Sequence, residues 1–204
     1  MNLSHQQLQD YLQDAGLSCI ITEHQSDLIF QFLQLRDQWS QTHNLSGPQA
    51  LQTVWTDVID VCALTEVINN DLPILDIGSG SGVPGLMLAC IKPKHNIYLI
   101  EPAAKRCAFL KTAAYRLQLK NIHVWRGRWP WSQPLEEQYQ IMSRAVIDPK
   151  KWPLWAQHDH VQEIIQMLAA ERPQWPIVES TLQAEVNYQS PLGGHRQIRR
   201  WSVS

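Results

Sequence analysis

The stretch LPILDIGSGSGVPGL, Leu72 to Leu86, contains two overlapping glycine patterns. Read from Asp76 it is DxGxGxG, which usually indicates a methyl donor, whereas GxGxxG from Gly80 to Gly85 indicates a dinucleotide. In both interpretations an apolar strand leads into a glycine turn and then into a helix beginning near Pro84, where a first-turn proline is tolerated. The stretch therefore predicts one strand, turn and helix unit of an α/β fold.

The chain beyond this unit continues to alternate short apolar runs with helical segments, a pattern typical of a parallel sheet. We expect strands at 73–77, 96–100, 121–125 and 139–143, and helices at 84–91 and 103–119. Two later runs, 184–188 and 197–203, flank Gly193 and Gly194 and predict a closing antiparallel pair. The expected fold class is therefore α/β, with a Rossmann-like sheet that is mostly parallel.

The segment between these parts has a weaker pattern. Val161, Ile164, Ile165 and Leu168 recur at helical spacing, so we expect one more helix there. A short strand is expected at 175–178.

The first 70 residues show helical periodicity and no strand alternation. Apolar stripes recur within 8–15, 28–39 and 54–68, and Gly16 stands where the first helix would end. We therefore expect an N-terminal helical cap at 1–71 and a cofactor-binding domain at 72–204.

Charge is distributed unevenly about the glycine turn. Residues 1–72 carry nine acidic side chains and a single basic one, Arg36, whereas 73–204 carry sixteen basic and ten acidic side chains. This asymmetry is compatible with a basic face for nucleic acid on the second part, and equally with an ordinary solvated surface.

Cysteine usage and hydropathy point to the cytoplasm. Cys19, Cys62, Cys90 and Cys107 are far apart in apolar surroundings, so we expect reduced core thiols. No basic stretch followed by an apolar run opens the chain, so neither export nor membrane insertion is expected. The HDH sequence at 158–160 offers too few convergent ligands for a metal.

The glycine turn and the next strand supply candidate cofactor contacts. Gly78, Gly80 and Gly82 let the backbone approach a ligand, and the following helix N-terminus favours an anion; a purely structural turn is the alternative. Glu101 ends the second expected strand, where a carboxylate can accept hydrogen bonds from two ribose hydroxyls. Because NAD and S-adenosylmethionine both carry that ribose, the choice rests on Asp76, which favours the methyl donor.

Several motifs resemble one family more closely than they resemble α/β cofactor folds in general. They are DIGSGSGVPGLMLA, LIEPAAKRCAFLKTAAYRLQLKNIHV, GRW and MSRA, preceded by WSQTHNLSG and WTDVIDV. From about residue 39 to 146 the chain is similar to the glucose-inhibited division protein B family, the bacterial guanine-N7 methyltransferases of small-subunit ribosomal RNA. The resemblance implies a class I methyltransferase sheet and S-adenosyl-L-methionine as the cofactor.

The resemblance also implies which residues serve this chemistry. The glycine loop, the acid after the second strand and the segment after the third would hold the cofactor, and the arginine of SRA would lie beside the methyl centre. The expected cofactor-binding residues are Asp76, Gly78, Ser79, Gly80, Gly82, Val83, Glu101, Arg128, Trp129, Pro130 and Arg144. Arg144 is also the expected catalytic residue. We expect a cytoplasmic monomer that acts on small-subunit ribosomal RNA or the 30S subunit, without a metal.

Two features can also be argued from the residues themselves. Arg144 follows the fourth expected strand, so its guanidinium can meet a methionine carboxylate or an RNA phosphate, unless it is a plain surface arginine. In VWRGRWPW, 124–131, arginines alternate with tryptophans. The aromatic faces can stack on a base or on the cofactor adenine while the arginines hold phosphate. Core packing with solvent-directed arginines is the alternative.

The substrate side departs from the family pattern. Asp57, Val58 and Val61 stand where the family usually has an arginine-histidine pair, Pro130 and Gln140 replace expected acids, and the LKG strand end is missing. Fewer basic residues should weaken phosphate binding. A methyltransferase with another acceptor, a cofactor-binding protein with little activity and a dinucleotide-dependent oxidoreductase therefore remain open.

Overall fold

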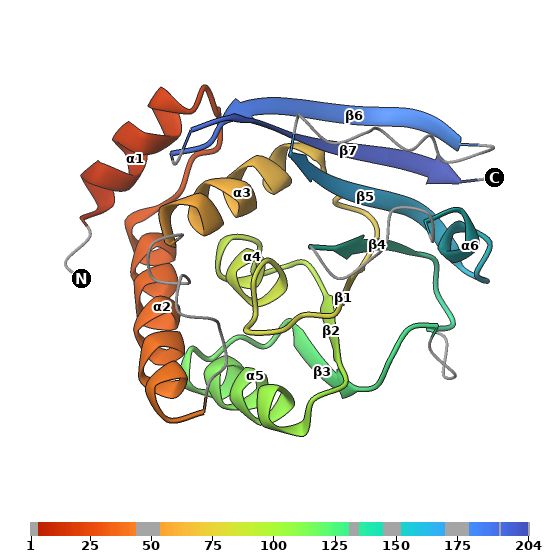
Figure 1. Cartoon of the computed structure of the whole chain (residues 1–204), viewed down its shortest axis with the longest axis horizontal. Helices are drawn as coiled ribbons and strands as arrows, with labels where there is room; N and C mark the ends of the chain where they lie inside the picture. The colour runs from red at the N-terminus through yellow and green to blue at the C-terminus, as the bar shows by residue number, and fades with distance from the viewer. Residues whose placement is uncertain are drawn as a thin grey trace.

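Seven strands form one sheet in the order β3-β2-β1-β4-β5-β7-β6. The structure is a computed structural model and describes residues 4–43, 54–130, 135–144, 152–169, 180–191 and 193–203. β1 to β5 are parallel, and β7 runs antiparallel to both β5 and β6 (Figure 1). This confirms the predicted Rossmann-like sheet with its C-terminal antiparallel pair. The strands are β1 Ile74–Ile77, β2 Ile97–Glu101, β3 Ile122–Arg126, β4 Tyr139–Ser143, β5 Val161–Ala169, β6 Ser180–Gln189 and β7 His195–Val203.

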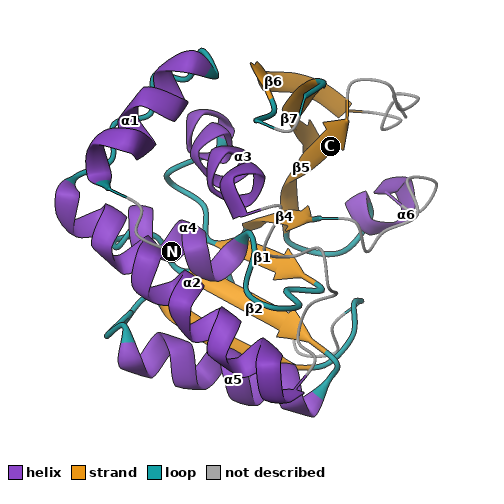
Figure 2. Ribbon diagram, turned by 60° about the vertical axis from the view of Figure 1, so that its left-hand side comes forward, coloured by secondary structure: helices purple, strands orange, loops and turns teal. Residues whose placement is uncertain are grey.

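Helices cover the two faces of the sheet unequally. In Figure 2, α1 to α5 lie on one side of the sheet and α6 lies on the other. Within the described ranges, none of the helices is long and apolar enough to cross a membrane. The helices are α1 His5–Asp14, α2 Glu23–His43, α3 Val54–Val67, α4 Gly85–Ile91, α5 Ala104–Arg116 and α6 Trp152–Ala156.

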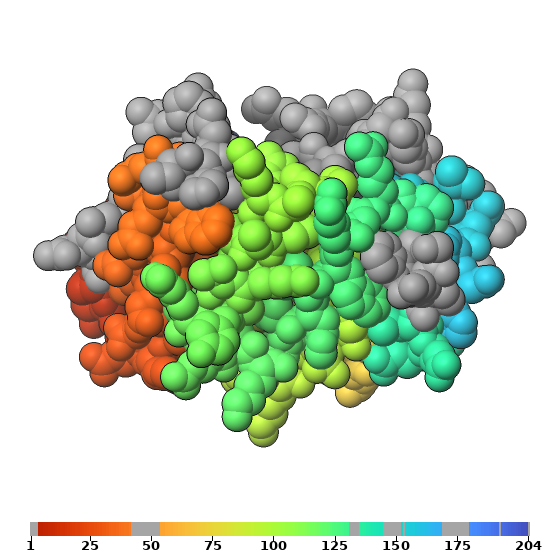
Figure 3. Space-filling view, turned by 90° about the horizontal axis from the view of Figure 1, so that it is seen from below, coloured from red at the N-terminus to blue at the C-terminus, as the bar shows by residue number. Residues whose placement is uncertain are grey.

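The N-terminal helices share a core with the rest of the fold. Phe32 of α2 and Phe109 of α5 are both buried, and their ring centroids are 6.4 Å apart. In the space-filling view the orange side chains of α2 lie directly beside the green side chains of the α5 to β3 part of the chain (Figure 3). The boundary between a cap at 1–71 and a domain at 72–204 stays a prediction, because the two parts are packed together by a common apolar cluster.

Side chains of the central strands alternate between two cores. Ile74 of β1 belongs to the cluster under α1 to α5, whereas Leu75 and Ile77 belong to the cluster on the side of α6. Because successive strand residues point to opposite faces, a parallel sheet buried on both faces reads as a continuous apolar run. This explains why 73–77 could be recognised from the sequence.

The helix predicted around 161–168 is wrong, since this segment forms strand β5, paired with β4 and β7. The alternating pattern of a strand was not visible because two polar residues, Glu163 and Gln166, are buried in the sheet. Glu163 binds Arg200, and Gln166 accepts a hydrogen bond from Trp201 at 3.0 Å. Residues 175–178 lie outside the described part of the chain. The short helix α6 was not expected.

Candidate active site

The strand order reverses between β1 and β4, and ligands of open α/β sheets bind at the carboxyl ends of the strands at such a point. Asp76 pairs in register with Met142, and Ile77 with Ile100. The glycine turn after β1, Glu101 at the end of β2 and Arg144 after β4 therefore lie along one edge of the sheet. The structure thus brings the main predicted site residues together.

Backbone hydrogen bonds and left-handed glycines fix the turn after β1. Gly78, Gly80 and Gly82 have φ angles of 76°, 58° and 88°, values that residues with a Cβ rarely adopt. The N–H of Gly78 donates to the carbonyl oxygen of Ile100 at 2.8 Å. A Cβ at Gly82 would lie 3.1 Å from Leu86. The turn therefore depends on glycine both for its backbone path and for the space it leaves.

Asp76 joins strand β1 to the start of helix α4. Its Oδ2 accepts a hydrogen bond from the N–H of Gly85 at 3.1 Å, and its carbonyl oxygen accepts one from the Ser79 hydroxyl at 2.8 Å. Burial raises the pKa of Asp76 to about 7, against the opposing effect of the Gly85 N–H. Oδ1 is buried without a hydrogen-bond partner among the described residues, so one acceptor at this edge is unused.

Gly85 allows the helix to approach the sheet closely. A Cβ at this position would lie 2.4 Å from Cδ2 of Leu99 and 2.5 Å from Oδ2 of Asp76. Both distances are far shorter than ordinary contacts between heavy atoms. The nearby Val83, at the end of the turn, is also buried. Val83 and Gly85 therefore both serve packing.

Glu101 is held in place by the backbone on both sides. Its Oε2 accepts a hydrogen bond from the N–H of Gly80, and its Oε1 accepts one from the N–H of Ala103, both at 2.9 Å. The guanidinium of Arg106 lies 3.9 Å from Oε1. An ionised carboxylate offers about four acceptor positions, so the two backbone hydrogen bonds orient Glu101 and leave capacity for ligand hydroxyls.

The segment after β3 follows Glu101 at the same edge. The N–H of Gly127 donates to the carbonyl oxygen of Glu101 at 3.2 Å, and the next residues, Arg128 and Pro130, are exposed. Between them, the Trp129 ring centroid lies 4.7 Å from that of His158 and 5.9 Å from that of Trp155.

The tryptophans of 124–131 do not form one stacking surface. Trp125 packs on Tyr98 with centroids 4.8 Å apart, whereas Trp129 packs beside α6. The indole N–H of Trp129 is buried without a partner among the described residues, and Trp131 lies outside them. Contact between the Arg128 to Pro130 segment and a cofactor adenine stays a prediction.

Arg144 is held by acidic residues of helix α3. Its Nη1 lies 2.5 Å from Oδ1 of Asp57 and 3.7 Å from Oδ2 of Asp60. The other carboxylate oxygen of Asp57 binds Nη1 of Arg36 on α2 at 2.8 Å. Burial acts to lower the pKa of Arg144, but the adjacent Asp57 and Asp60 outweigh it and raise this pKa. Arg144 is therefore not a plain surface arginine.

The C-terminal hairpin completes this ion network. Asp60 accepts a hydrogen bond from the hydroxyl of Tyr188 on β6 and binds Nη1 of Arg196 on β7, both at 2.7 Å. Burial raises the pKa of Asp60, and the attraction of Arg196 opposes this rise. We use the term ion network for Arg36, Asp57, Asp60, Arg144 and Arg196.

Most of the ion network was missed from the sequence. Two acids, Asp57 and Asp60, interrupt the otherwise apolar run from Val54 to Leu64, and buried acids require partners. Arg36, the only basic residue in the first 72, was the available signal on the N-terminal side. Nothing in the local pattern of β7 identified Arg196, because its contact with Asp60 depends on the strand order.

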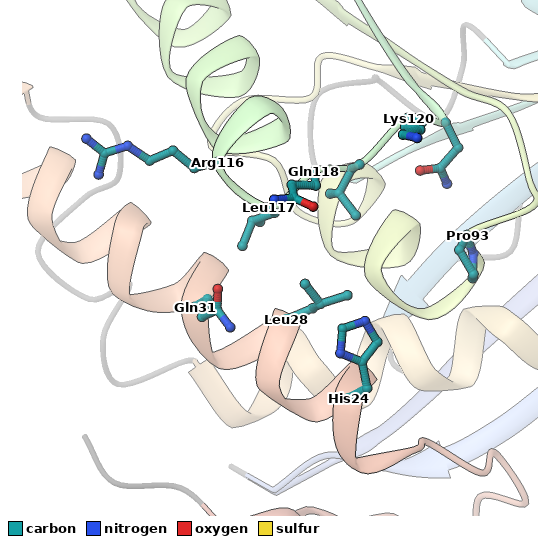
Figure 4. A pocket seen from close by; sticks show the side chains of 10 residues that line it. His24, Leu28, Gln31, Pro93, Arg116, Leu117, Gln118 and Lys120 are labelled. Atoms are coloured by element: carbon teal, nitrogen blue, oxygen red, sulfur yellow. The ribbon is translucent and has the colours of Figure 1, made fainter.

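A pocket of about 450 Å³ lies at the opposite edge of the sheet (Figure 4). It is lined by His24 and Leu28 of α2, by Pro93, which precedes β2, and by Asn121, which precedes β3. Because Pro93 and Asn121 lie at the amino ends of β2 and β3, this pocket is distinct from the glycine turn. Among the described residues, no group of three or more His, Cys, Asp and Glu side chains is arranged to hold a metal.

Sequence comparison links the chain to one group of proteins. The family model GidB, described as rRNA small subunit methyltransferase G, matches residues 25–192. Ribosomal RNA small subunit methyltransferase G of Dichelobacter nodosus is 31% identical over 144 residues, covering 69% of this chain and 67% of that protein. The protein of the same name from Helicobacter pylori strain 26695 is 39% identical over 119 residues, covering 58% of this chain and 67% of that protein.

Solved structures with little sequence similarity share the fold. A mutant of MtNAS in complex with S-adenosylmethionine has a TM-score of 0.57 at 13% identity, covering 99% of this chain and 85% of that one. TrmN from Thermus thermophilus has a TM-score of 0.52 at 17% identity, covering 72% of this chain and 49% of that one. At such low identities, the similarity extends to the fold and no further.

Proposed function

Because the chain belongs to the GidB family, rRNA small subunit methyltransferase G, as its motifs predicted, we propose that it methylates N7 of a guanine in small-subunit ribosomal RNA. The proposed methyl donor is S-adenosyl-L-methionine. The observation that carries this proposal is the hydrogen bond from the Gly80 N–H to Glu101 at the carboxyl ends of β1 and β2. It fixes a glycine turn and a carboxylate side by side at the edge where ligands of such sheets bind.

The residues at this edge fit the chemical groups of the donor. Glu101 offers carboxylate acceptors for ribose hydroxyls, and glycines with positive φ leave the backbone of the turn open to close approach. Arg144 supplies a guanidinium, which suits the methionine carboxylate. Arg128, Trp129 and Pro130 would lie on the adenine side.

Methyl transfer to guanine N7 places modest demands on the protein. When bound, S-adenosylmethionine supplies a methyl group on a positively charged sulfur. N7 of guanine has a free lone pair and carries no proton, so no side chain has to act as a general base. The task of Glu101 and Arg144 is to hold the donor so that acceptor, methyl group and sulfur are aligned.

An RNA acceptor agrees with the charge of residues 73–204. The sixteen basic side chains of residues 73–204 exceed the ten acidic ones, and basic side chains supply most of the affinity for phosphates. The exposed Arg126 ends β3 at the ligand edge, and the exposed Arg128 follows it. We therefore also propose a cytoplasmic location, which the four free cysteines support.

The test is an assay with S-adenosylmethionine labelled on its methyl group. The protein is incubated with 30S subunits and, separately, with naked small-subunit RNA, and the RNA is digested to nucleosides. We expect label in 7-methylguanosine and none when Arg144→Gln replaces the wild type. Label in another nucleoside, or none in RNA, would overturn the proposed acceptor.

Calorimetry tests the cofactor independently of the acceptor. S-adenosylmethionine, S-adenosylhomocysteine and NAD are titrated separately into the protein. We expect binding of the first two and weak or no binding of NAD. Preferred binding of NAD would contradict the proposed methyltransferase and indicate a dinucleotide-dependent enzyme instead.

A further inference from the structure

The reversed direction of β7 brings its first residues to the ligand edge of the sheet. Arg196, near the start of β7, pairs in register with Ala169 at the end of β5 and with Tyr188 near the end of β6. Because β5 is parallel to β4, this is the same edge at which Arg144 follows β4. In Figure 1, α3, which carries Asp57 and Asp60, lies next to β6 and β7.

Within the ion network the acids are buried and two of the bases reach the surface. The side chains of Asp57 and Asp60 are 6% and 1% exposed, whereas those of Arg144 and Arg196 are 30% and 35% exposed. Three guanidinium groups face two carboxylates, so the network has one positive charge in excess. The part that solvent reaches is therefore cationic.

The guanidinium groups of these two partly exposed arginines are close neighbours. Nη1 of Arg144 and Nη1 of Arg196 lie 3.7 Å and 2.7 Å from the same atom, Oδ2 of Asp60. The two groups therefore belong to one cationic site around Asp60. Guanidinium forks match phosphate oxygens with two parallel hydrogen bonds, which gives both affinity and orientation.

The position of Arg196 separates it from the expected cofactor contacts. Those contacts follow β1, β2, β3 and β4, whereas Arg196 lies two strands beyond β4, on the far side of β5. None of the expected cofactor contacts lies on β7. We propose that Arg196 binds a backbone phosphate of the RNA acceptor, next to Arg144, which holds the donor. This inference rests on the proposed function, because it names a binding residue for that acceptor.

The test compares two variants that differ only at Arg196. Removing Arg196 alone leaves Asp60 short of a partner, so Asp60→Asn is used as the reference and compared with Asp60→Asn/Arg196→Gln. Binding of naked small-subunit RNA is measured by filter retention at several salt concentrations. We expect about tenfold weaker binding for the double variant and a salt slope smaller by about one. The affinity for S-adenosylhomocysteine, measured by calorimetry, should change less than twofold.

Arg199→Gln is the matched control on the same strand. Arg199 is also paired with an acid, Glu185, but its side chain packs with Trp201 on the opposite face of β7. Its loss should leave both RNA affinity and salt slope unchanged. Equal RNA binding by Asp60→Asn and the double variant would overturn the role of Arg196. A wild-type protein that neither binds nor methylates RNA would overturn the proposed function as well, so the two failures are distinguishable.

Discussion

The backbone N–H of Gly80 donates a hydrogen bond to the carboxylate of Glu101 at 2.9 Å. The acid that ends β2 therefore holds the turn after β1 in position, so the proposed ribose acceptor and the glycine turn form one unit. A change at Glu101 should act on both.

Replacement of Glu101 tests this unit. Glu101→Ala removes the acceptor for ligand hydroxyls and for the Gly80 N–H, so we expect S-adenosylmethionine to bind about 1 to 3 kcal/mol more weakly, the scale of hydrogen bonds to a charged group. Isothermal titration calorimetry measures the loss. Arg106→Ala is the control, because its guanidinium is 44% exposed and 3.9 Å from Glu101. Unchanged affinity in Glu101→Ala would contradict the assignment.

Replacement of Gly85 tests the close contact of α4 with the sheet. Gly85→Ala would place a methyl group 2.5 Å from Oδ2 of Asp76 and 2.4 Å from Leu99. Alanine favours a helix by about 1 kcal/mol over glycine, yet we expect a net loss of about 1 to 3 kcal/mol in the free energy of unfolding, because overpacking forces backbone and side chains apart. Urea denaturation measures this loss. A variant as stable as the wild type would show that the contact relaxes without cost.

The buried carboxyl of Asp76 predicts a pH dependence of stability. Burial raises its pKa to about 7 in the folded protein, whereas an unfolded aspartate has a pKa of about 3.9. Between these values the folded state holds a proton that the unfolded state has lost. The free energy of unfolding should therefore fall by about 2 to 4 kcal/mol as pH rises from about 4 to about 7.

Asp76→Asn isolates this contribution. Asparagine keeps an oxygen for the Gly85 N–H but does not ionise, so the decline between pH 4 and pH 7 should become shallower in urea denaturation curves. Asp60, whose pKa is also raised, should contribute the decline that remains. Identical slopes for the wild type and Asp76→Asn would mean that Asp76 is ionised over this whole range.

The buried ion pair between Arg36 and Asp57 should contribute to stability. Arg36 and Asp57 are both 4% exposed, and removing one member of a buried ion pair leaves an uncompensated charge. We expect Arg36→Met to lower the free energy of unfolding by about 3 kcal/mol. Gln34→Met adds the same side chain at an exposed position of α2 and should change stability by less than about 0.5 kcal/mol. Equal stabilities of the two variants would show that Arg144 alone compensates Asp57.

The parts of the fold that could be predicted from the sequence depend on local patterns. The unit from β1 to α4 was predictable because glycine spacing and an apolar strand are adjacent in the chain. β5 was taken for a helix because Glu163 and Gln166 are buried by partners on β7, whose position no local pattern reveals. Arg196 was missed for the same reason. Its role depends on Asp60, which lies 136 residues earlier in the chain.

The reversed strand β7 also determines how far the chain can be shortened. A fragment ending before residue 180 would retain every residue expected to contact the cofactor, yet it would lack Tyr188 and Arg196, the partners of Asp60. Its sheet would end at β5, a long strand whose backbone groups would be unpaired along one side, and such an exposed edge is a template for aggregation. The glycine motif and its carboxylate therefore cannot be expected to form a stable minimal binding unit without the hairpin at the other end of the sequence.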